Sequence, residues 1–166
     1  MVNERFEGGF RELADVLSGF PEATAIIRGD DAHPLLAGIV LFFSTPFGTL
    51  VAAEIKGLPE RQDCESSVFG FHIHEGESCQ SVSAPFSETG GHYNPKNCPH
   101  PAHAGDMPPL ISSRGGYAVS VFLSSEFLLA DIIGKTVVIH AEADDFRTQP
   151  SGAAGGKIGC GVIKRT

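Results

Sequence analysis

The chain has 166 residues, with 20 acidic and 12 basic side chains and a net charge of −8. This length suits one domain, and 42% hydrophobic against 19% charged residues excludes an intrinsically disordered chain. The acidic balance argues against nucleic acid as a partner, because phosphate contacts need clustered Lys and Arg. A small anionic substrate would need a local positive region to approach such a protein.

The N-terminal residues 3 to 20 carry a helical pattern, with apolar side chains at spacings of three and four. These are Phe6, Phe10, Leu13, Val16, Leu17 and Phe20. The pattern predicts an N-terminal helical extension over residues 1–22, ended near Pro21, and a separate main domain over residues 23–166. We expect the helix to pack on the domain or on a partner subunit, so a homodimer is a possible assembly.

The apolar runs are short. The longest, residues 35–43, is strand-sized, whereas a bilayer span needs about 20 residues. The first residues include acidic side chains and glycines where a secretory leader would have a basic start and an apolar stretch. We therefore expect no membrane partner and a cytoplasmic location. Export, with the leader removed from this chain, is the alternative.

Seven strand-length runs bounded by turn-rich segments follow Pro21. They cover residues 23–29, 36–44, 49–58, 69–75, 117–123, 135–143 and 157–163. A short helical turn is expected within residues 126–134. This series predicts an all-β fold, a Greek-key β-sandwich or barrel of about eight strands with long loops, plus the short N-terminal helix.

Residues 75–116 show no strand or helix pattern for about 40 positions, which is unusual for a loop without a function. The segment holds three histidines, one aspartate and two cysteines that suit metal or disulfide chemistry: His92, His100, His103, Asp106, Cys79 and Cys98. A metal ion and a disulfide can order such a loop in place of a hydrophobic core. The four cysteines allow three complete pairings, and spacing alone does not choose among them.

Two metal sites are indicated. His72 and His74 form H-x-H in a strand and therefore point to one face, and His140 lies on another strand. Packed or surface histidines would give the same short pattern. The loop set of three histidines and one carboxylate, at spacings of eight, three and three, suits a closed structural zinc site. The strand set, rich in imidazole and with an open position, suits copper.

Five motifs resemble the copper/zinc superoxide dismutase family. They are G-F-H-I-H at 70–74, G-G-H-Y-N-P at 90–95, H-A-G-D at 103–106, V-I-H-A-E-A-D-D at 138–145 and G-C-G-V-I at 159–163. They occur in family order, and the resemblance runs from about residue 23 to residue 163. It implies disproportionation of superoxide, at a copper site that a histidine bridges to a structural zinc. The alternative is a non-enzymatic copper/zinc-binding module on the same fold.

The resemblance also implies residue roles. The copper ligands would be His72, His74, His92 and His140, and the zinc ligands would be His92, His100, His103 and Asp106. His92 would bridge both metals and serve in catalysis, and Asp144 would orient a histidine of each site. The family disulfide would join Cys79 to Cys160.

Two further expectations concern residues where this chain departs from the family or extends it. Lys157 stands where the family carries an arginine at the mouth of the copper channel. Lysine keeps the positive charge but loses the planar fork, so we expect a working but slower enzyme. Cys64 and Cys98 lie outside the family pattern, and we expect them to form a second disulfide that pins the zinc loop.

Overall fold

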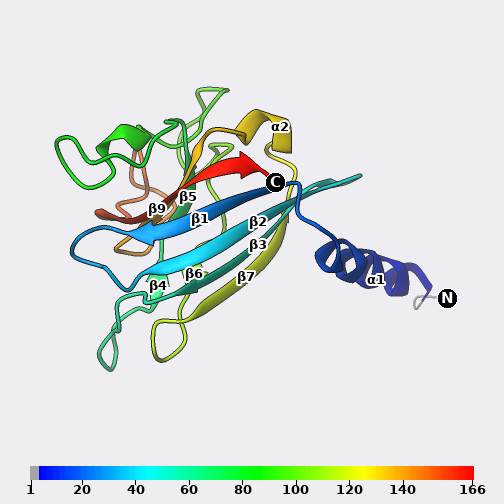
Figure 1. Cartoon of the computed structure of the whole chain (residues 1–166), viewed down its shortest axis with the longest axis horizontal. Coiled ribbons are helices and arrows are strands. Elements are labelled where there is room, and N and C mark those ends of the chain that lie inside the picture. Colours follow the sequence, from blue (N-terminus) through cyan, green and yellow to red (C-terminus); the bar gives the residue numbers. More distant parts are fainter. Residues whose placement is uncertain (1–3) are drawn as a thin grey trace.

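The computed structural model describes residues 4–166, and within the first helix it describes the exposure of Gly9 and the side chains of residues 11–18. A helix, α1 (Glu4–Ser18), precedes a strongly curled antiparallel sheet, and long loops cover one side of that sheet (Figure 1). None of the described helices combines the length and apolar character that crossing a bilayer requires.

Nine strands and two short helical pieces follow α1. The strands are β1 (Ala23–Gly29), β2 (Ala37–Thr45), β3 (Gly48–Lys56), β4 (Val68–Phe69), β5 (Phe71–His74), β6 (Leu110–Ile111), β7 (Ala118–Ser124), β8 (Thr136–His140) and β9 (Lys157–Arg165). The helical pieces are the 3₁₀ turn η1 (Ser87–Thr89) and α2 (Leu129–Ile132).

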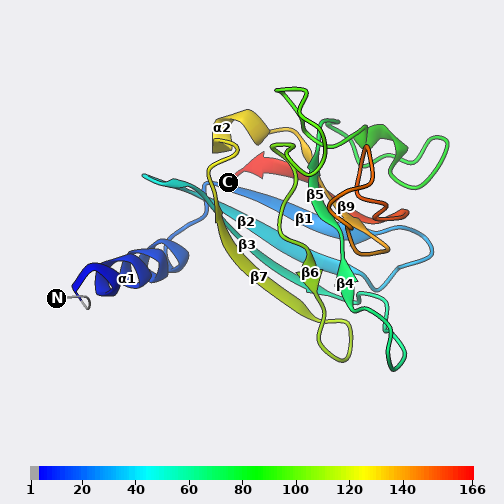
Figure 2. The same cartoon turned by 180° about the vertical axis from the view of Figure 1, so that it is seen from behind.

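The main sheet has the order β5-β8-β9-β1-β2-β3-β7, with every neighbouring pair antiparallel. β4 pairs with β6 beside β7, and only Gly70 separates β4 from β5, so the sheet curls almost into a barrel (Figure 2). The non-sequential neighbours in this order give the crossover connections of a Greek key. The predicted all-β class is therefore confirmed.

The barrel interior is filled by alternate residues of the strands. Large side chains with at most 1% exposure form its centre: Ile27, Phe42, Ile55, Phe69, Phe71, Ile73, Leu110, Ile139 and Ile163. In β5 and β8 the alternation places Phe71, Ile73 and Ile139 inward. The residues between them face the long loops, which is where the histidines lie.

Most predicted strands lie within one or two residues of their positions in the structure, and the helical turn before β8 is confirmed as α2. Two expectations need correction. β8 ends at His140, so residues 141–143 are not strand. The long loop contains the two-residue strand β6, whose Leu110 is completely buried, a pairing too short to leave a periodic pattern.

The N-terminal helix lies on the opposite side of the molecule from the long loops and projects beyond the sheet (Figures 1 and 2). It approaches β2, yet Leu17 is 38% exposed and Phe20, just after the helix, is 97% exposed. Asn3, the first residue of the predicted helix, lies outside the described part of the chain. So do the side chains of Phe6 and Phe10, which belong to the predicted apolar stripe. The described stripe is therefore only partly covered.

Candidate metal centre

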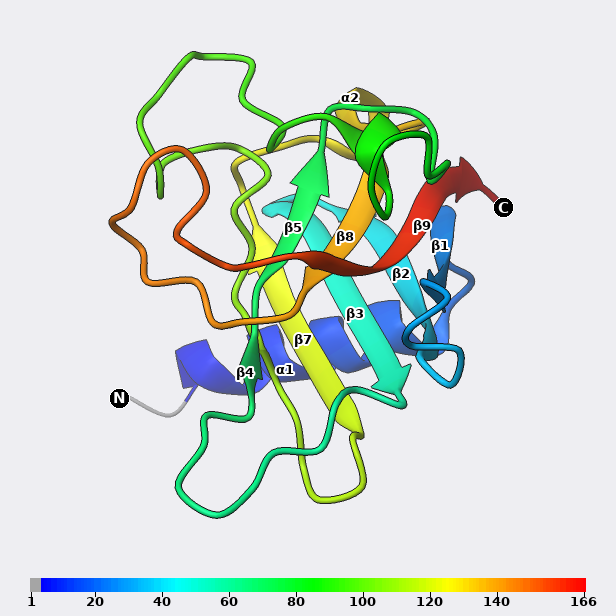
Figure 3. The same cartoon turned by 90° about the vertical axis from the view of Figure 1, so that its left-hand side faces the viewer.

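Strand β5 presents two histidines to the loop side of the sheet. His72 and His74 alternate with the inward Phe71 and Ile73, and yet all four residues are buried, because the loops cover the outer face. His140, at the end of β8, lies on the same outer face. Figure 3 shows β5, β8 and β9 side by side beneath the loop segments.

The long loop reaches this face by pairing with the free edge of β5. The carbonyl of Ile73 accepts a hydrogen bond from the Tyr93 N–H (2.8 Å), and the Ile73 N–H donates to the carbonyl of Gly105 (2.9 Å). This pairing sets His92 opposite His74 and Asp106 opposite His72. A side chain at Gly105 would collide with the Ile73 carbonyl, so the glycine permits the close approach.

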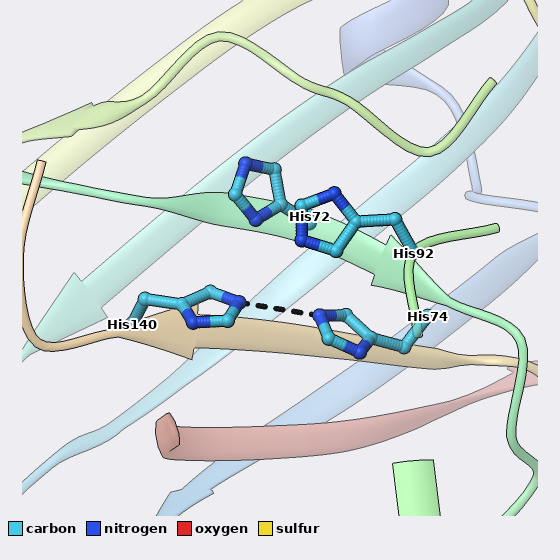
Figure 4. A group of neighbouring side chains, drawn as sticks. All are labelled: His72, His74, His92 and His140. Carbon is cyan, nitrogen blue, oxygen red and sulfur yellow. Dashed lines mark hydrogen bonds between the residues drawn. The ribbon is translucent and has the colours of Figure 1, made fainter. Parts of the chain in front are cut away.

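Hydrogen bonds to backbone carbonyls fix the tautomer of two histidines. Nδ1 of His74 lies 3.0 Å from the carbonyl oxygen of Gly90, and Nδ1 of His140 lies 3.2 Å from that of Gly155. A carbonyl oxygen only accepts, so both Nδ1 atoms must carry the proton. Each Nε2 therefore has a free lone pair, and the two Nε2 atoms lie 3.2 Å apart (Figure 4).

The buried carboxylate of Asp144 does the same for two further histidines. Its oxygens lie 2.8 Å from Nε2 of His72 and 2.9 Å from Nε2 of His100. If both Nε2–H groups donate to the carboxylate, the two Nδ1 atoms keep their lone pairs. Both Nδ1 atoms are buried and have no hydrogen-bond partner, which is costly unless something else binds them.

The first cluster is formed by His72, His74, His92 and His140, whose ligand nitrogens all lie within 4.8 Å of one another. Figure 4 shows the four rings gathered beside β5 and β8, with the His92 ring near that of His72. Burial lowers the pKa of His72 to about 2 and of His140 to about 4, and neighbouring imidazoles, His92 above all, add to the effect. The rings of His72 and His140 are therefore neutral at pH 7, as metal ligation requires.

The second cluster is formed by His92, His100, His103 and Asp106, again with all ligand atoms within 4.8 Å. The carboxylate oxygens of Asp106 lie 2.7 to 3.3 Å from Nδ1 of each histidine. For His100 this distance is 3.0 Å, without the angle of a hydrogen bond. A tetrahedral zinc site with bonds of about 2.0 Å would have ligand–ligand edges of about 3.3 Å, which the His103 distance matches, whereas the other two distances are shorter.

His92 belongs to both clusters. Its Nδ1 faces Asp106 at 2.7 Å, while its Nε2 is buried, unpaired and on the side of the first cluster. Burial would raise the pKa of Asp106, but the hydrogen bonds from His92 and the His103 N–H lower it overall, so the carboxylate stays ionised. One imidazole can thus offer one nitrogen to each of two cations.

Lys157 starts β9 beside the first cluster. Its ammonium group donates to the hydroxyl of Thr89 (2.6 Å) and to the carbonyl of Gly90 (2.9 Å), which is also the acceptor for His74. The side chain is half-buried, and burial lowers the pKa of Lys157. The sequence offered no signal for the part that Thr89 plays here, because a lone threonine in a loop has no distinguishing pattern.

Gln149 is a second residue that the sequence reasoning missed. Its side-chain amide accepts the His100 N–H (2.9 Å) and donates to the His100 carbonyl (2.7 Å). This pair of bonds joins two loops across 49 positions of the chain. Backbone restraints of this kind leave no trace in residue spacing.

The cysteines divide into one bonded pair and two free thiols. The disulfide Cys79–Cys160 is present, with a Cα–Cα distance of 5.8 Å, and packs with Phe86 and Val138 beneath the loop. The expected second bridge is wrong for this structure. Cys64 is an exposed free thiol in the loop before β4. Cys98 is a half-buried free thiol in the loop between His92 and Asp106, where the Asn94 side chain donates to the Cys98 carbonyl and accepts from the Cys98 N–H.

Comparisons with known proteins agree with this arrangement. A family model described as copper/zinc superoxide dismutase matches residues 36–163. The chain is 31% identical to a Cu-Zn superoxide dismutase of Deinococcus radiodurans, over 83% of this chain and 84% of the relative. It is 33% identical to one of Legionella pneumophila, over 86% and 87%. This chain belongs to the copper/zinc superoxide dismutase family.

Proposed function

We propose that this protein disproportionates superoxide, so that two superoxide anions and two protons yield one dioxygen and one hydrogen peroxide. The observation that carries the proposal is the pair of buried clusters that share His92. Four of the imidazole nitrogens that point into them have no hydrogen-bond partner: His72 Nδ1, His92 Nε2, His100 Nδ1 and His103 Nδ1. The donor set therefore fits two neighbouring cations of the copper and zinc type.

For copper we propose the ligands His72 Nδ1, His74 Nε2, His92 Nε2 and His140 Nε2. For zinc we propose His92 Nδ1, His100 Nδ1, His103 Nδ1 and a carboxylate oxygen of Asp106. When bound, copper supplies the one-electron redox chemistry, whereas zinc has a single oxidation state and supplies charge and order. Asp144 supports both sets by holding one ring of each.

His92 and Lys157 act on the substrate side of this site. His92 can hold a proton at Nε2 whenever that nitrogen is not bound to copper, and can pass the proton to the peroxide that forms from the second superoxide. Lys157 places a positive charge beside the first cluster in a chain whose net charge is −8, and so attracts the anion locally. Its bonds to Thr89 and Gly90 hold that charge in place.

Metal analysis combined with a superoxide consumption assay tests the proposal. Wild type should bind one copper and one zinc per chain and consume superoxide, and His140→Ala should lose copper and activity while keeping zinc. Wild type that carries both metals and consumes no superoxide would support the non-enzymatic metal-binding module instead.

For the domain organisation, we propose residues 23–166 as the family domain and residues 1–22 as an extension.

For the assembly, we propose a homodimer through the solvent-exposed face of β1, β3 and β7. Antiparallel sheets normally expose polar residues on that side. Here Ile26 of β1 and Val119, Val121 and Leu123 of β7 are 42 to 58% exposed. Lys56 and Glu54 lie on the same face, so a two-fold axis can pair opposite charges. Light scattering after chromatography should give a dimer mass that Val121→Lys reduces to a monomer.

For the compartment, we propose export as the better supported of the two alternatives, because the Cys79–Cys160 disulfide is typical of oxidising environments. Fractionation of cells that produce the full-length natural protein tests this, and recovery with cytoplasmic marker enzymes would contradict it.

A further inference from the structure

The side chain of Arg61 is much less exposed to solvent than the loop that carries it. In the segment between β3 and β4, residues 62–66 are exposed, yet the Arg61 side chain is only 22% exposed. Its guanidinium carbon lies 5.0 Å from the ring centroid of Phe69, and its Nε is buried without a hydrogen-bond partner. A surface-loop arginine that loses this much hydration must be held by specific contacts.

Those contacts lead to the two strands that carry the first cluster. Nη2 of Arg61 donates to the carbonyl of Ala141, the residue directly after His140, and lies 3.4 Å from a carboxylate oxygen of Glu142. Phe69, beneath the guanidinium, precedes His72 by three residues and is completely buried. One side chain therefore joins the chain just before His72 to the chain just after His140.

The main chain at this point leaves the regular strand ladder, although the N–H groups of Ala141 and Glu142 are bonded to carbonyls of the loop that follows β8 (2.8 Å each). The last regular pair between β5 and β8 is Phe71 with Ile139, and the register between β8 and β9 shifts between Ile139 and His140. Beyond that shift, Gly70 alone continues the β5 side, through bonds to His140 (2.9 Å) and Glu142 (2.8 Å). Such irregularities bend a strand and re-aim its side chains, so the orientation of His140 depends on what holds the bend.

We propose that Arg61 is a positioning residue for the copper site. It touches no ligand atom and acts through the Ala141 carbonyl, fixing the bend that sets His140 Nε2 opposite His74 Nε2. The proposal rests on the proposed function, since it takes His140 as a copper ligand. Lysine is a poor substitute for Arg61 here: Nη2 makes both bonds while the rest of the planar guanidinium lies over Phe69, and a lysine ammonium has no second part to cover that ring.

The test compares Arg61→Lys and Arg61→Ala with wild type, and uses Arg114→Lys as the matched control. Arg114 is exposed and lines the same open surface pocket as Arg61, so the control makes the same substitution without the contacts. With zinc loaded, we measure the EPR spectrum of Cu(II) and the rate at which copper passes to a chelator. Arg61→Lys should fold normally by circular dichroism, change the Cu(II) spectrum and release copper about tenfold faster, while the control matches wild type.

The conservative variant decides the outcome even if Arg61→Ala does not fold. A wild-type Cu(II) spectrum and release rate in Arg61→Lys would overturn the proposal. A lower melting temperature of metal-free Arg61→Lys together with an unchanged Cu(II) spectrum would also overturn it, because Arg61 would then stabilise the fold without positioning the copper ligand. Failure of the wild type itself to bind copper would instead refute the proposed function.

Discussion

Gln149 holds the backbone of His100 from both sides, with its side-chain amide 2.9 Å from the His100 nitrogen and 2.7 Å from the His100 oxygen. The loop that supplies Gln149 also supplies Asp144, whose carboxylate bonds the His100 ring. Main chain and ring of one proposed zinc ligand are therefore both fixed by a segment more than 40 residues away.

Replacing Gln149 with Glu should weaken zinc binding, because a carboxylate accepts the His100 N–H but cannot donate to the His100 carbonyl. The loss of one such bond corresponds to about 1 kcal/mol, or about fivefold in affinity. Competition with a zinc chelator measures it. Gln80→Glu, an exposed position with the same charge change, is the control, and equal affinities in the two variants would count against the role of Gln149.

Lys157→Arg should raise kcat/KM for superoxide, because a guanidinium can dock an anion with two parallel donors. Lys157→Gln should lower it, most strongly at low ionic strength, where charges are least screened. Stopped-flow superoxide decay at several salt concentrations compares the variants. Equal rates for the lysine and arginine forms would remove the basis for a slower enzyme.

The same residue predicts a pH dependence. Burial lowers the pKa of Lys157 below its ordinary value of 10.5, so its charge is lost as the pH rises, earlier than for a free lysine. The kcat/KM of the wild type should therefore fall on the alkaline side before pH 10.5. Lys157→Arg stays charged and should keep its rate through that range. An identical alkaline decline in both proteins would mean that another group titrates.

The extent to which the sequence predicts this site follows from the kind of contact involved. His72 and His74 are readable because alternation in a strand sets two side chains on one face, and the loop histidines because their spacing suits one cation. The acceptors Gly90 and Gly155 are not readable, since any residue has a carbonyl. Arg61 and Gln149 act on backbone across long separations, which only the folded chain brings together. The Cys64–Cys98 bridge failed as a prediction because the spacing of cysteines says nothing about which loops meet.

Gly152→Ala should damage the centre without replacing a ligand. Gly152 has a φ of 68°, which disfavours any side chain, and a Cβ there would collide with the Asp144 carboxylate and approach Nε2 of His100 within 2.7 Å. Asp144 would have to move away from the ring that it orients, so zinc affinity should fall about tenfold or more. Gly115→Ala, also at positive φ (82°) but with open space around it, controls for backbone strain. Chelator competition that shows no difference between the two variants would refute the clash.

Removal of the Cys79–Cys160 disulfide should destabilise the metal-free protein. The bridge spans 81 positions, and the chain-entropy treatment gives a contribution of about 4–5 kcal/mol for a loop of this size. Urea unfolding of Cys79→Ala with Cys160→Ala measures the loss, and Cys64→Ala with Cys98→Ala, which removes two free thiols, should leave the midpoint nearly unchanged. Denatured wild type should react with two equivalents of a thiol reagent before reduction and four after it. A count of zero before reduction would show that Cys64 and Cys98 are bonded after all, and a large midpoint shift in their double variant would then be expected.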